Sequence, residues 1–205
     1  MIISEHAQGT PGWFADRAGI PTMSSIDKII TSTGKPSAQS EGYMNTLLAE
    51  WMTGAKQSIK QTEWMARGVE LEPEARLAYE IMSGNEVQEV GFCFKDDSKL
   101  VGCSPDGLIG DDGMLEIKCP APGTHVGYML KAKLPTTYVQ QVQGQLWVAG
   151  REWADFVSYS PDMDSVIIRV EKDEKFHEAL DELIGKFINT MLEKREQLTK
   201  ARKAA

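Results

Sequence analysis

The sequence predicts an α/β (α+β) domain in which helices flank one central mixed β-sheet. Apolar residues recur at helical spacing within the first 83 residues and again over 137–149 and 175–203. Between these stretches, the segments 85–120, 153–160 and 165–172 alternate or run apolar, as strands do. The order helices, strands, helix, strands and helix is typical of a domain whose helices pack against a single sheet.

The chain length fits one domain over residues 1–205. We expect residues 1–12 to form a loose N-terminal arm and residues 175–205 to form a C-terminal helix with a tail. This last segment is highly charged, so it is a candidate docking surface for another protein. A packed amphipathic helix with a solvated end explains the same pattern equally well.

Three helices are expected in the first 83 residues, at 22–31, 43–52 and 63–83. The first would begin at Ser24 or Ser25, because a serine side chain accepts hydrogen bonds from the free N–H groups of a helix start. Pro73 lies inside the third pattern, where it either kinks the helix or marks the start of its second part.

The composition excludes several classes of protein. Hydrophobic residues make up 41% and charged residues 25% of the chain, which is ordinary for a folded domain and argues against disorder. No run of about 20 apolar residues predicts a membrane span, and the N-terminus lacks the features of a signal peptide. Three cysteines favour a reducing cytoplasm over a disulfide scaffold.

The net charge of −8 bears on the choice of partner. An acidic chain, taken alone, argues against a nucleic-acid partner. It does not exclude one, because carboxylates that bind a metal contribute negative charge of their own and a basic patch can exist locally.

The most informative segment is SPDGLIGDDGMLEIKCP, residues 104–120. Because alternate side chains of a strand share a face, Glu116 and Lys118 point one way while their neighbours pack into a core. Asp106 ends the preceding strand, and a tight hairpin would bring it alongside Glu116. Adjacent carboxylates repel each other unless a cation lies between them, and Mg²⁺ prefers oxygen ligands. Ile117 could add its backbone carbonyl, and Lys118 could orient a metal-bound water for attack on phosphorus.

A simpler explanation of these residues is a solvated charged pair. Such pairs are common on exposed strand faces, and the pattern Glu-x-Lys occurs by chance in many proteins. The Pro-Asp-Gly turn at 105–107, with strand patterns on both sides, favours the metal site over this alternative.

The hairpin resembles a known family. PD at 105–106 followed by EIK at 116–118 resembles the signature of PD-(D/E)XK nucleases, and CSPDG with LEIKCP is similar to the family of lambda exonuclease and YqaJ-type viral recombinases. Four further segments resemble this family in order and spacing: TLLAEWMTG (46–54), RGVELEPEAR (67–76), YVQQVQGQLWV (138–148) and VEKDEKFHEALDELIGKFI (170–188). The resemblance covers about Trp13 to Phe187 and implies a restriction-endonuclease-like core.

The resemblance implies a metal site and a catalytic lysine in the hairpin. Asp106 and Glu116 would be the metal-binding carboxylates, with the Ile117 backbone carbonyl as a further ligand. Lys118 would be the catalytic lysine. The family implies Mg²⁺ as the cofactor, with two ions in each active site and Mn²⁺ as a substitute.

Two further catalytic residues are implied on helices. Glu72 matches the helix glutamate that faces the metals, and Gln141 matches a glutamine near the nucleophile or the scissile phosphate. Glu70 and Glu74 are equally plausible in place of Glu72 on position alone. Gln141 has three glutamine neighbours, Gln140, Gln143 and Gln145. Gln145 would share the helix face of Gln141, and one of the two could simply be solvated.

The N-terminal segment WFADRAGIPTMS, residues 13–24, resembles the part of the family that holds a DNA 5′-phosphate. It implies that Arg17 and Ser24, joined by Ser104, bind this group. The planar fork of an arginine suits a terminal phosphate. A surface ion pair is the alternative explanation of Arg17.

The function implied is a Mg²⁺-dependent 5′→3′ exonuclease that degrades one strand of linear duplex DNA from 5′-phosphorylated ends to mononucleotides. The 3′ single-stranded tails would serve recombination with a single-strand annealing protein in a bacterial cytoplasm, from a phage or prophage. The family also implies a ring-shaped homotrimer. Its channel could be lined by lysines: Lys28, Lys35, Lys56, Lys60, Lys131 and Lys133. The alternatives are an endonuclease or repair nuclease with the same core, and a non-catalytic DNA-binding partner.

Overall fold

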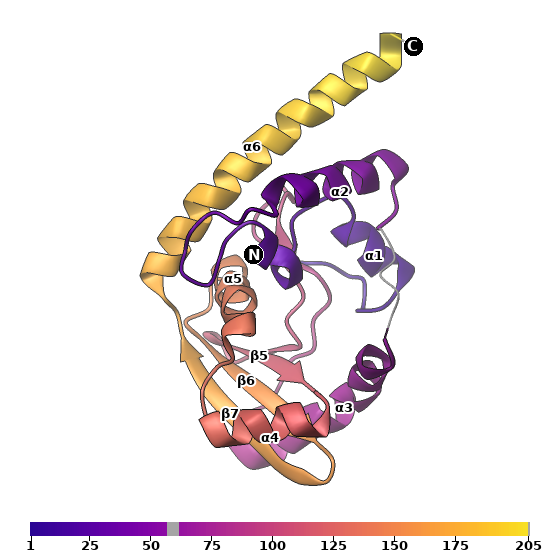
Figure 1. Cartoon of the computed structure of the whole chain (residues 1–205). Coiled ribbons are helices and arrows are strands. Elements are labelled where there is room, and N and C mark those ends of the chain that lie inside the picture. Colours follow the sequence, from indigo (N-terminus) through magenta and orange to yellow (C-terminus); the bar gives the residue numbers. More distant parts are fainter. Residues whose placement is uncertain (57–61, 205) are drawn as a thin grey trace.

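The computed structural model of the chain describes residues 1–56 and 62–204, and it confirms the mixed α+β class (Figure 1). Within these residues the strands form two sheets instead of the single sheet expected. The smaller sheet has the order β1-β2-β3: Ile2–Ile3, Cys93–Phe94 and Gly102–Cys103. The larger sheet has the order β4-β5-β6-β7: Gly107–Ile109, Gly113–Lys118, Trp153–Ser160 and Met163–Glu171. The division falls at 104–106, where Pro105 has no N–H for a strand ladder.

The described part of the chain also forms these helices: α1 (Pro11–Arg17), the 3₁₀ helix η1 (Met23–Lys28), α2 (Ser40–Thr53), α3 (Glu63–Ser83), α4 (Pro122–Lys131), the 3₁₀ helix η2 (Thr136–Tyr138), α5 (Val139–Ala149) and α6 (Glu174–Ala204). The helices predicted at 43–52, 63–83, 137–149 and 175–203 are therefore confirmed. Pro73 lies inside α3, which is assigned as one helix from Glu63 to Ser83.

The N-terminal residues 1–12 are not the loose arm expected. Ile2–Ile3 form β1 and pair with β2, and the Ser4 N–H donates to the Phe92 carbonyl at 2.8 Å. The first helix begins at Pro11, whose fixed φ suits a first helical position. The arm prediction was wrong because a two-residue strand is too short to produce a visible alternation.

The helix expected over Thr22–Thr31 is also shorter than predicted. Only the six-residue 3₁₀ helix η1 forms, and Thr22 takes the N-cap position instead of a serine. Ser25 has φ −129° and ψ 17°, which is outside the helical region and interrupts η1. Ser24 is therefore not needed as a cap, and its hydroxyl bonds to Arg17 instead.

The register of the larger sheet positions the hairpin residues. β5 and β6 are parallel and central, while β4 and β7 pair with them in antiparallel fashion. In the β4–β5 hairpin Gly107 lies opposite Leu115, so the residue before β4 lies beside the residue after Leu115. This register brings Asp106 next to Glu116, as the sequence predicted.

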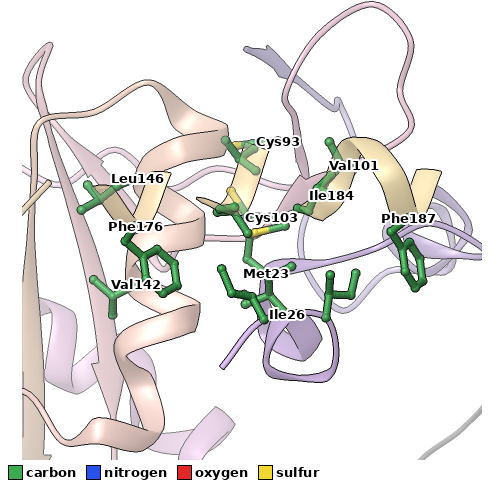
Figure 2. Close-up of a cluster of buried hydrophobic side chains, with 14 of the residues drawn as sticks. Met23, Ile26, Cys93, Val101, Cys103, Val142, Leu146, Phe176, Ile184 and Phe187 are labelled. Carbon is green, nitrogen blue, oxygen red and sulfur yellow. The ribbon is translucent and has the colours of Figure 1, made fainter. Parts of the chain in front are cut away.

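Helices cover both faces of the larger sheet (Figure 1). Buried residues of α3 pack against one face, in a cluster with alternate residues of β5 and β6: Ala75, Tyr79, Leu115, Ile117, Val157 and Tyr159. On the other face lies a larger cluster that joins α5, α6, η1 and the small sheet, and Figure 2 shows part of it: Met23, Ile26, Cys93, Cys103, Val142, Leu146, Phe176, Ile184 and Phe187. Even-numbered residues of β5 point to this second face, so Glu116 is directed towards α5.

Helix α6 begins against this core and ends beyond it. Phe176, Leu180 and Ile184 recur every four residues and are buried, which fixes the first half of the helix on the domain. The last turns extend past the rest of the molecule (yellow in Figure 1). In the part of the chain that the structure describes, no helix combines the length and apolar character needed to cross a membrane.

A buried polar network fastens α3 to the sheet. The Tyr79 hydroxyl donates to Asp155 Oδ2 at 2.7 Å, and Arg169 Nε donates to Asp155 Oδ1 at 2.6 Å. Burial, helped by the bond to Asp155, raises the pKa of Tyr79 from 10.0 to about 12. The phenol therefore holds its proton more tightly in the folded chain than in the unfolded one.

This network predicts a loss of stability at alkaline pH. Because the pKa of Tyr79 is raised on folding, its contribution is complete below pH 10 and disappears as the pH rises towards 12. The loss should be on the order of 2–3 kcal/mol. We expect urea unfolding between pH 9 and pH 11.5 to show a smaller decline for Tyr79→Phe than for the parent. An equal decline in both proteins would contradict this assignment.

Candidate active site

The hairpin between β4 and β5 holds the two carboxylates predicted to bind metal. The Asp106 N–H donates to the Leu115 carbonyl at 3.1 Å, and Asp106 Oδ2 accepts the Ile117 N–H at 2.5 Å. The Asp106 side chain is thus fixed beside β5. Burial raises the pKa of Asp106 well above its usual range, and the nearby carboxylates of Glu116 and Glu72 raise it further, against the opposing effect of Lys118.

Glu116 is almost fully buried, with only 1% of its surface exposed. Its Oε1 accepts hydrogen bonds from Lys118 Nζ and from Gln141 Nε2, the latter at 2.6 Å. Its Oε2 accepts from Gln145 Nε2 at 2.7 Å. Gln141 was selected from the sequence by resemblance, whereas Gln145 was named only as one of its neighbours. The spacing of four residues is the signal that places both on one helix face.

Lys118 lies between the carboxylates and an aromatic ring. Burial alone would lower the pKa of its ammonium group, but Glu116 and Asp106 outweigh this effect and raise it. The Nζ also lies 5.3 Å from the centre of the Tyr138 ring. Tyr138 was not predicted from the sequence. These contacts keep Lys118 positively charged and directed at the carboxylates.

Glu72 reaches the same region from α3. Arg76 Nη2 donates to Glu72 Oε1 at 2.6 Å, and Arg76 Nε donates to the Asp106 carbonyl at 3.2 Å. Burial raises the pKa of Glu72. Of the alternatives, Glu74 instead accepts from the Tyr159 hydroxyl at 2.5 Å, near the C-terminal end of β6. Arg76 was missed in the sequence, although its spacing of four residues from Glu72 predicts an ion pair.

The donor set fits a hard divalent cation. Three carboxylates, from Asp106, Glu116 and Glu72, face two cationic side chains, Lys118 and Arg76, and Arg76 also pairs with Glu89 at 2.9 Å. The acidic charge is therefore only partly balanced. Within residues 1–56 and 62–204, no three His, Cys, Asp or Glu side chains are grouped so that they could hold a metal ion by themselves. Mg²⁺ needs only one or two protein carboxylates and keeps several waters, so Asp106 and Glu116 are chemically suitable ligands for it.

A second group of predicted residues gathers around Arg17, and we call this cluster the Arg17 pocket, after the phosphate pocket that the family resemblance implies. Its Nη1 donates to the Ser104 hydroxyl at 3.0 Å and its Nη2 to the Ser24 hydroxyl at 3.2 Å. The guanidinium lies 4.2 Å from the centre of the Trp13 ring, and Trp13 Nε1 also donates to the Ser104 hydroxyl, at 2.8 Å. The structure therefore brings together the three residues that the sequence assigned to a phosphate pocket.

Arg17 is not the surface ion pair that was the alternative explanation. Only 8% of it is exposed, and burial lowers its pKa. Among the described residues, no carboxylate lies within ion-pair distance of it, and its Nε has no hydrogen-bond partner. A buried cation with hydroxyl and aromatic neighbours is a suitable site for an anion. The sequence did not indicate Trp13 as a member, because a tryptophan is more often a core or helix-packing residue.

The two groups are joined by one short segment. Ser104 contributes its hydroxyl to the Arg17 pocket, and Asp106, two residues later, contributes its carboxylate to the acidic site. Pro105 lies between them and is buried. The pocket and the acidic site are therefore neighbours in space as well as in sequence.

The lysines predicted to line a channel have different environments. Lys28 lies 5.1 Å from the centre of the Tyr43 ring, and Lys56 pairs with the buried Glu50 at 3.6 Å. Three are exposed: Lys35, Lys131 and Lys133. Lys60 lies outside the described residues. These positions alone do not define a channel.

Comparisons with known proteins agree with this geometry. Residues 12–152 match the family model of the YqaJ-like viral recombinase domain. The crystal structure of an alkaline exonuclease, LHK-Exo, from Laribacter hongkongensis is 34% identical and has a TM-score of 0.86, with 96% of this chain and 100% of that chain covered. A structure of LHK-Exo in complex with dAMP matches with a TM-score of 0.84 at the same identity and coverage.

A more distant structure shares the fold alone. A phage related exonuclease from Haemophilus somnus 129PT is 15% identical, with a TM-score of 0.64 over 85% of this chain and 96% of that chain. No curated protein matches the sequence. The family model covers more than half of the chain and LHK-Exo nearly all of it. The chain therefore belongs to the YqaJ-like viral recombinase family, of the alkaline exonuclease type.

Proposed function

We propose that this protein is a Mg²⁺-dependent 5′→3′ exonuclease that degrades one strand of linear duplex DNA from 5′-phosphorylated ends and releases mononucleotides. The observation that carries this proposal is the position of the Arg17 pocket, which is linked through Ser104 to the acidic site at Asp106. An endonuclease has no need of a pocket for a terminal phosphate beside its metal site. The relative that binds dAMP, a deoxynucleoside monophosphate, supports the release of mononucleotides.

In the proposed reaction, Asp106 and Glu116 would hold the metal together with the Ile117 backbone carbonyl, and Glu72 would face it from α3. Bound Mg²⁺ supplies an activated water and stabilises charge on the phosphate. Lys118 donates a hydrogen bond to the attacking water or to a phosphate oxygen. Gln141 holds Glu116 in place from α5 at 2.6 Å and would lie near the nucleophile or the scissile phosphate.

The Arg17 pocket would position the end of the strand. Hydrolysis of the bond between phosphorus and the 3′-oxygen releases a nucleoside 5′-monophosphate and leaves a new 5′-phosphate on the shortened strand. Arg17, Ser24 and Ser104 would then bind this new end, so that the next phosphodiester bond falls at the acidic site. The 3′ single-stranded tail left behind is the substrate of strand annealing, so we propose a single-strand annealing protein as partner and a ring-shaped homotrimer as the working form.

The proposal is tested with four substrates: linear duplex with 5′-phosphate ends, the same duplex with 5′-hydroxyl ends, a nicked circle and a covalently closed circle. We expect digestion with Mg²⁺ or Mn²⁺ to be fastest for the phosphorylated linear duplex, and the closed circle to remain intact. Cleavage of the closed circle would instead establish an endonuclease. The absence of digestion of any substrate with either metal would favour a non-catalytic DNA-binding protein.

The Arg17→Ala substitution should remove the preference for a 5′-phosphate. Charge-assisted hydrogen bonds of this kind contribute about 1.5–3 kcal/mol, so the rate on phosphorylated ends should fall roughly 10- to 100-fold. The rate on 5′-hydroxyl ends should change little. Arg202→Ala, in the exposed end of α6, is the control and should behave as the parent. If Arg17→Ala kept the parent's preference for 5′-phosphorylated ends, the Arg17 pocket would not be the site that binds the 5′-phosphate.

A further inference from the structure

Helix α5 carries two buried glutamines that are bonded in different ways. Gln143 has both amide atoms paired, because its Nε2 donates to the Glu171 carbonyl at 2.8 Å and its Oε1 accepts the Asp173 N–H at 2.9 Å. Gln145, only 1% exposed, donates through Nε2 to Glu116 Oε2 at 2.7 Å and to the Ser104 carbonyl at 3.4 Å. Gln143 therefore joins secondary-structure elements, whereas Gln145 joins the two parts of the candidate site.

The environment of Gln145 is not explained by packing. Its Oε1 is buried and has no hydrogen-bond partner among residues 1–56 and 62–204, which costs folding free energy. Apart from Gln143, whose amide is fully paired, the other buried positions of α5 carry no polar side chain: Val142, Gly144, Leu146, Val148 and Ala149. An apolar side chain of the same length would fill this position without an unpaired oxygen. What only the glutamine provides is an amide N–H between a metal-binding carboxylate and the phosphate pocket.

The rest of α5 strengthens this connection. Gly144 lies so close to η1 that an added Cβ would come within 2.5 Å of Met23 Sδ, and Met23 is followed by Ser24 of the phosphate pocket. Gln141, one turn earlier, bonds the other oxygen of Glu116. A single rigid helix thus contacts both the Arg17 pocket and the acidic site.

We propose that Gln145 is a positioning residue that fixes the spacing between the 5′-phosphate pocket and the metal-binding carboxylates, and thereby determines how strongly a bound 5′-phosphate accelerates cleavage. This inference rests on the proposed function. Gln145 holds Glu116 Oε2 and the Ser104 backbone together, so a phosphate bound at Ser104 is held in register with the acidic site. Without the amide, the pocket would still bind a phosphate, but the scissile bond would be less well placed.

The test compares Gln145→Met with Gln143→Met, a matched loss of a buried amide on the same helix. We expect Gln145→Met to lower kcat on 5′-phosphorylated duplex roughly tenfold or more, with KM nearly unchanged, because misplacement affects the chemical step. The rate on 5′-hydroxyl duplex should fall much less, so the ratio of the two rates declines. Gln143→Met should keep the ratio of the parent. Gln145→Glu keeps the shape of the side chain but lacks the N–H donor, so it should show the same selective loss of kcat on 5′-phosphorylated duplex. This variant takes the place of Gln145→Met in the test if Gln145→Met does not fold.

A binding measurement without divalent metal separates positioning from general damage. Fluorescence anisotropy with 5′-phosphorylated and 5′-hydroxyl duplexes should show the same preference in Gln145→Met as in the parent, because the Arg17 pocket is intact. The inference is overturned if Gln145→Met keeps the rate ratio of the parent, if Gln143→Met loses it equally, or if the phosphate preference in binding disappears. A parent enzyme with no preference for 5′-phosphate in its rates would instead refute the proposed function itself.

Discussion

We expect the Lys118→Ala protein to lose roughly 10²- to 10⁴-fold in kcat on linear duplex DNA while remaining folded. Lys118 is the only lysine or arginine among the described residues that pairs with Glu116, and its Nζ also faces the Tyr138 ring. Alanine would leave the buried Glu116 with the two glutamine donors, Gln141 and Gln145, but without a positive charge. The attacking water and the phosphate would then lack a cationic hydrogen-bond donor.

The measurement is a single-turnover digestion of 5′-phosphorylated duplex at saturating Mg²⁺, with circular dichroism to confirm folding. Lys172→Ala is the matched control, because Lys172 pairs with Glu152 and Glu174 at the surface and lies outside the site. This control should digest DNA as the parent does. A Lys118→Ala protein with the parent's rate would exclude Lys118 from the chemistry.

The Asp106→Asn protein should separate activity from stability. Asparagine can still accept the Ile117 N–H, and its neutral amide removes the repulsion between Asp106 and Glu116. Without metal, the variant should therefore unfold at the same temperature as the parent or at a higher one. Its cleavage rate should nevertheless fall by about 10²-fold or more, because a neutral amide is a weak ligand for Mg²⁺.

Thermal unfolding with and without metal tests this prediction directly. In the parent, a metal at 100 times its Kd should add about 2.7 kcal/mol to the free energy of unfolding, and most of this gain should be absent in Asp106→Asn. Asp111→Asn, in the exposed turn of the same hairpin, should keep the full gain. If Mn²⁺ and Mg²⁺ stabilised the Asp106→Asn protein as much as the parent, Asp106 would not be a metal ligand.

The hairpin could be predicted because its information is local. The alternation of Leu115, Glu116, Ile117 and Lys118 determines which side chains share a face, and the turn at 110–112 determines which residues lie opposite each other. Local pattern was less reliable at the N-terminus. There, the short β1 and the 3₁₀ helix η1 are held by partners more than 70 residues away, such as Phe92 and Gly102.

The local sequence pattern does not distinguish the roles of neighbouring glutamates in α3 or of neighbouring glutamines in α5. Glu72 and Glu74 are both plausible on sequence, and only the packing of α3 on the sheet directs Glu72 to Arg76 and Glu74 to Tyr159. Gln145 likewise differs from Gln143 only through the direction in which α5 presents it. The sequence pattern of a helix shows which of its residues share a face. Which face meets the sheet depends on side-chain packing against distant segments.

The sequence by itself determined the mixed class of the fold, the position of its long helices and the pairing of Asp106 with Glu116, because strand alternation and turn spacing act over a few residues. Only the tertiary structure decided that Arg17 is a buried cation beside Ser104, that Arg76 and Trp13 belong to the two parts of the site, and that Gln145 connects them. These relations join residues 29 to 91 positions apart, and they exist only once helices and sheets have packed around a common core.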